Sequence, residues 1–144
     1  MECVFCEDPK VNNRIIYQNN CVKALLTVTP IVPGHILIMP IRHLKYWEDL
    51  TAEEKINLEE VRIKMKNVLK KAFHAQGFNF AWNEELIGGQ SVPHLHLHVV
   101  PRKKDDAGIY DYEPRKFLYR PGSRNVSPDE ELLEVVKILK ENLV

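Results

Sequence analysis

The sequence predicts an α+β fold, in which an antiparallel sheet of about five strands carries one long helix and a C-terminal helix. Two groups of short runs rich in branched residues flank a long stretch with helical periodicity, and the chain ends in a second amphipathic stretch. The 144 residues are enough for one hydrophobic core and too few to favour a division into two. We therefore expect a single domain over residues 1–144, with a variable loop and the C-terminal helix at about 103–144.

The first three strands are expected in the N-terminal part of the chain. Residues 14–28, RIIYQNNCVKALLTV, form two extended runs joined at Asn19 and Asn20, which tolerate the positive φ angles of a tight hairpin turn. Cys21 lies in the second run and is expected to be a core thiol. The third strand, GHILIMP at 34–40, is bounded by Pro33 and Gly34 on one side and by Pro40 on the other.

A long helix is expected from about Ala52 to Phe73. Thr51 and Glu54 have the spacing of a capping box, in which each side chain accepts a hydrogen bond from the backbone N–H of the other. Gly77 is expected to end the helix. Apolar residues recur at helical spacing and predict a buried stripe of Leu58, Val61, Met65, Val68, Leu69 and Ala72.

The second half of the chain supplies two further strands and the last helix. The strands are FNFAWNE at 78–84 and HLHLHVV at 94–100, with a turn at Gly88 and Gly89 between them. Ser127 as N-cap, Pro128 at the first helical position and Glu130 three residues after the cap predict where the helix begins. Its buried stripe is expected to contain Leu132, Val135, Val136 and Leu139.

The stretch between Arg102 and Ser127 has no clear periodicity and is longer than the roughly 12 to 15 residues that a structureless loop of a compact domain usually reaches. It is interpreted either as a substrate cover or subunit contact, or as a partly disordered surface excursion. Its aromatic and basic residues are Tyr110, Tyr112, Arg115, Phe117, Tyr119 and Arg120.

The composition argues against several classes of function. Lys plus Arg equal Asp plus Glu at 20 each, so the overall charge gives no reason to expect a nucleic acid or membrane partner. The N-terminal residues resemble no signal peptide, and no apolar run is long enough to cross a bilayer. We therefore expect a cytoplasmic protein. Three cysteines in such a chain favour thiols or metal ligands over disulfides.

Three histidines alternate along one predicted strand, at His94, His96 and His98. Because side chains of a strand alternate between its two faces, the three imidazoles are expected on one face, about 6.6 Å apart between neighbours. Three imidazoles on one strand cannot easily share one metal ion, so each is expected to have its own task. The interleaved residues are expected in the core: Leu95, Leu97 and Val99.

HLHLHVV resembles the His-x-His-x-His-x-x signature, with apolar x, of the histidine triad superfamily of nucleotide hydrolases and transferases. The resemblance extends to GGQSV at 88–92, to PIVPGHILIMP at 30–40 and to Asn83, and so covers most of Cys3 to Arg102. It implies a HIT-like fold. It also implies a homodimer with the long helix and the sheet edge at the interface.

The resemblance assigns roles to residues of this sequence. His96 is expected to attack the α-phosphorus of a nucleotide and form a nucleotidyl-histidine intermediate, for which its attacking nitrogen must be unprotonated. His98 is expected to donate to the phosphate oxygens as charge develops. Gln90 and Ser91 add neutral donors near the phosphate and the leaving oxygen.

Further residues are expected to position the nucleotide. Gly88 and Gly89 let the backbone approach the phosphate without a Cβ in the way. His35 is expected to be a hydrogen-bonding partner behind the triad. Asn83 is expected to contribute to nucleotide recognition, together with Thr27, which stands where the family commonly has an Asp or Asn that holds the ribose hydroxyls.

Cys3 and Cys6 form a Cys-x-x-Cys pair, whose spacing suits tetrahedral zinc, a redox dithiol or neither. One branch of the superfamily supplies two further zinc ligands at positions that correspond here to His43 and His94. The resemblance therefore implies a structural Cys2His2 zinc site. A His94 bound to zinc could not act as a general acid, which leaves Ser91, His98 or water to protonate the leaving group.

These expectations favour a hydrolase that cleaves at the α-phosphate of dinucleoside polyphosphates or nucleotide phosphoramidates. A nucleotidyl transferase or phosphorylase, which passes the nucleotidyl group to phosphate or a sugar phosphate, remains an alternative. A nucleotide-binding regulator without useful turnover is a third interpretation. A catalytic metal held by the histidine triad is disfavoured by the spacing of the three side chains.

Overall fold

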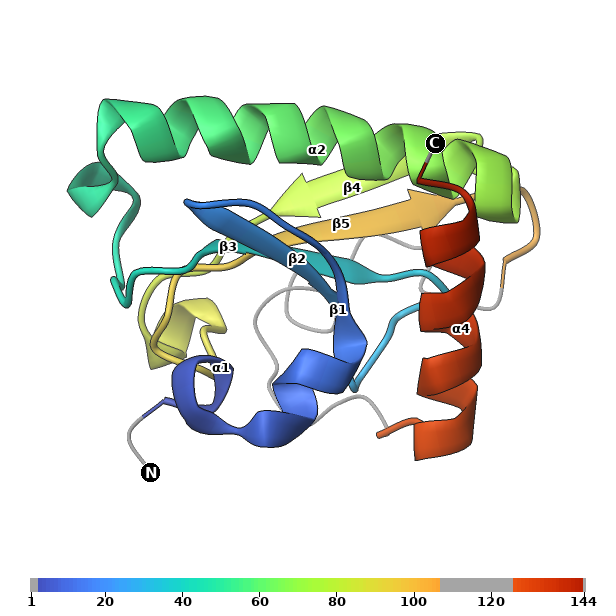
Figure 1. The fold of residues 1–144 in the computed structure, drawn as a ribbon, viewed down its shortest axis with the longest axis horizontal. Helices are drawn as coiled ribbons and strands as arrows, with labels where there is room; N and C mark the ends of the chain where they lie inside the picture. Colours follow the sequence, from blue (N-terminus) through green and yellow to red (C-terminus); the bar gives the residue numbers. More distant parts are fainter. Residues whose placement is uncertain (1–2, 107–125, 144) are drawn as a thin grey trace.

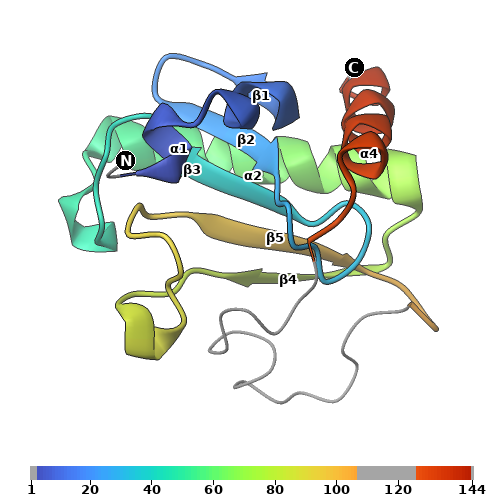
Figure 2. The same ribbon diagram turned by 90° about the horizontal axis from the view of Figure 1, so that it is seen from below.

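The computed structural model describes residues 3–106 and 126–143. Five strands form one antiparallel sheet in the order β1-β2-β3-β5-β4, which confirms the predicted α+β class (Figure 2). The last strand, β5, pairs between β3 and β4, so β4 lies at one edge of the sheet and β1 at the other. The strands are β1 (Ile15–Gln18), β2 (Val22–Leu26), β3 (Ile36–Pro40), β4 (Gly77–Ala81) and β5 (Leu97–Arg102).

Helix α2 (Ala52–Phe73) packs across one face of the sheet, where it contacts β2, β3 and β5 (Figure 1). The capping box is present: the Glu54 N–H donates to the Thr51 hydroxyl at 3.0 Å, and the Thr51 N–H donates to the Glu54 carboxylate at 2.9 Å. The predicted stripe faces the core, with Ala72 partly buried and five members fully buried: Leu58, Val61, Met65, Val68 and Leu69.

The prediction that Gly77 ends α2 is wrong. His74 is the C-cap: it adopts the left-handed conformation at φ 56°, and its N–H donates to the Leu69 carbonyl oxygen. Gly77 already pairs with Arg102 as the first residue of β4. The helix nevertheless ends at Phe73 as predicted, and the chain turns at His74 before Gly77 enters the sheet edge.

Helix α4 (Asp129–Glu141) lies beside the β1 edge of the sheet and touches α2 (Figure 1). The prediction that Ser127 caps this helix is wrong. Its N–H donates to the Val28 carbonyl oxygen at 2.9 Å, and Pro128 is the N-cap without a side-chain cap bond. Val135 is partly buried, and the remaining members of the predicted stripe are buried: Leu132, Val136 and Leu139.

The face of the sheet opposite α2 is covered by the N-terminal segment, which forms α1 (Val4–Glu7) and a 3₁₀ helix (Pro9–Arg14) (Figure 1). Every residue of β2 and β3 is buried, because these central strands are covered on both faces. Cys21 lies in the turn just before β2, partly buried, and not inside a strand as expected. The apolar cluster under α1 consists of Cys3, Phe5, Val11, Leu25, Leu37 and Met39.

The predicted loop with its aromatic and basic residues lies outside the described residues over 107–125, so its interpretation stays a prediction. No helix within residues 3–106 and 126–143 is long and apolar enough to span a membrane.

Candidate functional site

The three alternating histidines do not lie in one strand, so that prediction is wrong. Strand β5 begins at Leu97, and only His98 belongs to it. The preceding segment bonds elsewhere: the Leu95 N–H donates to the Leu44 carbonyl oxygen at 2.7 Å, in the loop after β3. The interleaved residues are buried as predicted: Leu95, Leu97 and Val99.

The three imidazoles nevertheless lie on the side of the sheet that α1 covers. The ring centroids of His96 and His98 are 5.0 Å apart. Phe5 of α1 contacts His96 at 5.2 Å and His94 at 5.9 Å, in both cases edge to face. Each histidine has a different set of hydrogen-bonding partners, so each is held for a different purpose.

His96 is buried, and its ring orientation is set by its own backbone neighbour. Its Nδ1 lies 2.7 Å from the His94 carbonyl oxygen, which can only accept a hydrogen bond. Nδ1 therefore carries the proton of the neutral ring, and Nε2 is the unprotonated nitrogen. This is the tautomer that a nucleophilic imidazole requires.

His98 is oriented by a chain of two hydrogen bonds that runs through His35. The Ile31 N–H donates to His35 Nδ1 at 3.1 Å, so the proton of the neutral His35 ring is on Nε2. His35 Nε2 lies 2.9 Å from His98 Nδ1 and donates to it. The proton of a neutral His98 is consequently on its own Nε2, which makes that nitrogen a hydrogen-bond donor.

His94 is fully buried, and its two ring nitrogens face a carbonyl oxygen and the two cysteine sulfurs. Its Nε2 donates to the Pro40 carbonyl oxygen at 2.8 Å, which leaves Nδ1 as the unprotonated nitrogen. Burial, which disfavours the charged ring, lowers the pKa of His94 to about 4. A neutral His94 with an unprotonated Nδ1 is suited to bind a metal ion.

A pocket of about 350 Å³ opens beside His96 and His98. Ser91 and Thr27 also line it, the first exposed and the second buried, so the structure brings four of the predicted site residues together. Its size is in the range of small-molecule sites. The remaining lining comes from α1, the 3₁₀ helix, the sheet and α4: Val4, Phe5, Asp8, Lys10, Asn13, Arg14, Val28, Thr29, Leu37, Val92, Asp129, Leu132 and Leu133.

Three other predicted residues do not line this pocket among the described residues, namely Asn83, Gly89 and Gln90. These three residues lie in or next to the turn before Ser91, and two of their side chains donate hydrogen bonds to backbone carbonyl oxygens. The Asn83 side chain donates to the Gly89 carbonyl oxygen at 3.4 Å, and Gly89 has φ 98°, which favours glycine. The buried Gln90 amide donates to the Lys45 carbonyl oxygen at 3.5 Å. Their contacts with a nucleotide therefore stay predictions.

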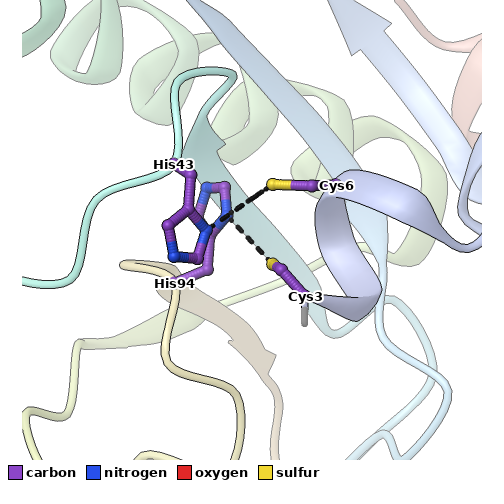
Figure 3. A group of neighbouring side chains, drawn as sticks. All are labelled: Cys3, Cys6, His43 and His94. Carbon is purple, nitrogen blue, oxygen red and sulfur yellow. Dashed lines mark hydrogen bonds between the residues drawn. The ribbon is translucent and has the colours of Figure 1, made fainter. Parts of the chain in front are cut away.

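The four predicted metal ligands converge from three separate segments (Figure 3). Cys6 comes from α1 and Cys3 is its N-cap, while His43 comes from the loop after β3 and His94 from the segment before β5. Their ligand atoms all lie within 4.8 Å of one another. The sulfur of Cys6 lies 3.6 Å from His43 Nδ1 and 3.4 Å from His94 Nδ1, and the sulfur of Cys3 lies 3.5 Å from His94 Nδ1.

This geometry fits a tetrahedral metal ion. With metal–sulfur and metal–nitrogen bonds of about 2.3 and 2.05 Å, a tetrahedral angle separates sulfur from nitrogen by roughly 3.6 Å. The observed separations of 3.4 to 3.6 Å agree with that value. His94 also has the second bond, to a backbone carbonyl, that orients most metal-bound histidines. The four residues could therefore hold a metal ion.

Two parts of the pocket could not be inferred from the sequence. Phe5 lies between the two cysteines and contacts both His94 and His96, but no local pattern relates residue 5 to residue 96. Helix α4 contributes Asp129 and Leu133, whose exposed positions gave no sign of a ligand. The fold alone brings these segments to the same pocket.

Comparison with known proteins gives a match to the HIT domain over residues 8–105. The bis(5'-nucleosyl)-tetraphosphatase [asymmetrical] of Schizosaccharomyces pombe is 35% identical over 96 residues, which are 67% of this chain and 53% of the relative. This chain thus spans about half the length of that relative. The bis(5'-adenosyl)-triphosphatase of Dictyostelium discoideum is 29% identical over 136 residues, covering 90% of this chain and 88% of the relative.

The fold also matches solved structures. A Zn-bound histidine triad family protein from Mycobacterium smegmatis has a TM-score of 0.73 and 27% sequence identity, and the match covers 99% of this chain and 94% of the other.

Proposed function

The chain belongs to the HIT domain family, whose match covers residues 8–105, and from this premise we propose that it is a nucleotide hydrolase. Its proposed reaction is cleavage at the α-phosphate of dinucleoside polyphosphates or nucleotide phosphoramidates. The observation that carries the proposal is the pair of complementary histidines in one pocket, an unprotonated Nε2 on His96 and a protonated Nε2 on His98. The names of the relatives from S. pombe and D. discoideum support it.

The first chemical step forms a bond between His96 Nε2 and the α-phosphorus, while the bond from phosphorus to the leaving oxygen or nitrogen breaks. The His94 carbonyl oxygen, which accepts from Nδ1, favours the positive charge that develops on the ring. In the second step water attacks the same phosphorus and the bond from phosphorus to His96 Nε2 breaks, which releases a nucleoside monophosphate, while the proton of the water passes to solvent. His98 Nε2–H donates to the nonbridging oxygens as their charge increases.

The leaving group has to be protonated by another residue than His94. Both nitrogens of that ring are directed elsewhere, Nε2 to the Pro40 carbonyl oxygen and Nδ1 to the two cysteine sulfurs. Ser91 lines the pocket and is exposed, so it is the proposed donor to the leaving group, either directly or through water.

We propose that the four converging ligands hold a structural zinc ion. The zinc-bound relative from M. smegmatis supports this assignment, as do the sulfur–nitrogen separations. A bound ion would stabilise the domain, because it would tie the N-terminal segment to the segment before β5. None of the four ligands lines the pocket, so the ion would supply no chemistry there. Metal analysis of protein purified without added metal should give about one zinc per chain, and any value near zero would contradict the proposal.

We further propose a homodimer that joins the β4 edge and the neighbouring surface of α2. Phe80 of β4 and Ile63 of α2 are 38% and 46% exposed, and the Arg62 guanidinium lies 4.9 Å from the centre of the Phe80 ring. Sedimentation of the wild-type chain should give twice the monomer mass. Ile63→Glu should shift it toward the monomer, whereas the control Ile56→Glu, at an exposed site near the start of α2, should not.

The test of function is a substrate panel of dinucleoside polyphosphates and nucleotide phosphoramidates, with and without inorganic phosphate. Release of nucleoside monophosphate in plain buffer supports hydrolysis, and a requirement for phosphate indicates the phosphorylase alternative. Binding without turnover on every compound would indicate a regulator. His96→Ala should abolish turnover and the acid-labile adduct on the protein, and full activity in that variant would rule out the covalent mechanism.

A further inference from the structure

Arg14 is a buried cation whose hydrogen-bonding capacity is mostly unused. It is 8% exposed, and it lines the pocket that also contains His96. Among the described residues its guanidinium makes a single hydrogen bond, from Nη1 to the Leu26 carbonyl oxygen, and no ion pair within 4 Å. A guanidinium has five N–H donors, and burying them without acceptors is costly. The remaining donors are therefore available to a ligand in the pocket.

The position of Arg14 in the sheet shows which part of a nucleotide it can reach. His98 pairs with Leu37, Leu37 with Leu25, and Leu25 with Ile15, the residue after Arg14. Three steps between strands of about 4.8 Å place the two ends of this row roughly 14 Å apart. That distance is too long for a contact with an α-phosphate bound at His96. A nucleotide whose α-phosphate binds at His96 could therefore reach Arg14 only with its sugar or its base.

Acidic groups stand at the same end of the pocket as Arg14. Asp8 and Asp129 both line it, and both are close enough to raise the pKa of Arg14, although burial has the larger effect and lowers it. Neither carboxylate forms an ion pair with Arg14 among the described residues. Oδ1 of Asp8 accepts from the Lys10 N–H, so this end of the pocket offers the N–H donors of Arg14 together with Oδ2 of Asp8 and the carboxylate of Asp129 as acceptors.

We propose that Arg14 recognises the O6 and N7 acceptors of a guanine base, which makes the protein selective for guanine nucleotides. A guanidinium matches these two acceptors in a bidentate contact, as it does at guanine in nucleic acids. Adenine presents an amino group at the corresponding position, which would face the N–H groups of Arg14. Asp129 and Asp8 complement the N1–H and N2–H donors of the same base. The inference rests on the proposed function, because it places the phosphate at His96.

The first experiment uses the wild-type chain and compares the symmetrical tetraphosphates of guanosine, inosine and adenosine. Inosine keeps O6 and N7 and lacks only the amino group at C2. If Arg14 reads O6 and N7, kcat/KM for both oxo-purines exceeds the value for adenosine by roughly 5- to 150-fold, the range of one good bidentate contact. A preference for guanosine over inosine would assign an additional contact to the carboxylates. Equal values for guanosine and adenosine would overturn the inference and leave the proposed hydrolase intact.

The second experiment compares Arg14→Met with the control Lys10→Met, since Lys10 is an exposed cation that lines the same pocket. Arg14→Met should remove the preference for guanosine, whereas Lys10→Met should keep it. The ratio of kcat/KM for the guanosine and adenosine tetraphosphates, measured on one variant, does not depend on the folded fraction of that variant. An unchanged ratio in Arg14→Met would contradict the inference.

If neither a tetraphosphate nor a phosphoramidate is hydrolysed, the proposed function fails and the inference is decided by binding. Calorimetric titration of the wild-type chain with GMP and AMP should then give tighter binding of GMP by the same factor. Equal affinities, or no binding of either, would contradict it.

Discussion

Replacing His35 tests whether the hydrogen-bond chain through this residue makes His98 a donor. His35 is completely buried, accepts from the Ile31 N–H at 3.1 Å and donates to His98 Nδ1 at 2.9 Å. In His35→Leu both of these bonds are lost, and with them the contact that fixes the proton of His98 on Nε2. His35→Gln is the matched variant, because its amide oxygen can accept from Ile31 and its amide nitrogen can donate to His98.

The expected loss of kcat in His35→Leu depends on His98, which remains in the pocket. Complete removal of a donor to a developing oxyanion costs about 100- to 1000-fold in kcat. His98 is still present, so the loss should be smaller, about 10- to 100-fold, the range for residues that orient a metal-bound histidine through its second nitrogen. The Ile31 N–H also loses its acceptor, which costs about 1 to 3 kcal/mol of stability where water cannot replace it.

The assay is steady-state release of nucleoside monophosphate by wild type, His35→Leu and His35→Gln, at protein concentrations corrected for the folded fraction by circular dichroism. We expect His35→Leu to lose activity mainly in kcat, and His35→Gln to retain most of it. Equal activity of His35→Leu and wild type would refute the role of the chain. Equal losses in both variants would indicate that the imidazole contributes only by filling space.

Other predictions concern stability. Thr51→Ala removes half of the capping box and should lower the free energy of unfolding by about 1 kcal/mol in urea titrations, and an unchanged midpoint would speak against the cap. The hydrogen bonds that Arg42 donates lower the pKa of Glu54, so the stabilisation by Glu54 should be complete above the unfolded pKa of about 4.3 and disappear as the pH falls through the lower folded value. Glu54→Gln should therefore be less stable than the wild type at neutral pH and equally stable in acid. A difference in the free energy of unfolding that is the same at all pH values would contradict this origin. Cys6→Ser should lower both the metal content per chain and Tm, and a chelator should lower the Tm of the wild type. An equal Tm for the variant and the metal-loaded wild type would contradict a structural metal. Leu139→Ala, at a completely buried position of α4, should cost about 2 to 5 kcal/mol in the same titrations, and a cost below 1 kcal/mol would mean that α4 is not docked as described.

The long helix could be predicted to the residue because its signals are local. The Thr51–Glu54 capping box marks where α2 begins, and its buried stripe repeats within single turns of the same helix. The last residue of α2, Phe73, was predicted correctly, but the residue that caps it was not, because more than one residue can take the left-handed conformation that ends a helix. His74 took it, and Gly77 was used by the sheet instead.

The start of β5 was also predicted wrongly, for a reason that no single segment contains. An alternating pattern marks which side chains face the core, and these are buried as predicted. Whether a residue is in a strand depends on the segment that receives its hydrogen bonds. Leu95 bonds to Leu44 in a loop, so the ladder with β3 includes only Leu97 and the residues that follow.

The sequence by itself determined the fold class, the approximate positions of α2 and α4 and the choice of the three histidines as site residues, since hydrophobic periodicity and short motifs are properties of neighbouring residues. Only the tertiary structure decided which nitrogen of each ring carries the proton, since a carbonyl or a second ring chooses the tautomer. It also decided that Cys6 meets His94 across 88 positions of the chain, and that Arg14 shares a pocket with His96. Such contacts join segments that are distant in sequence, and their geometry exists only after the sheet has assembled.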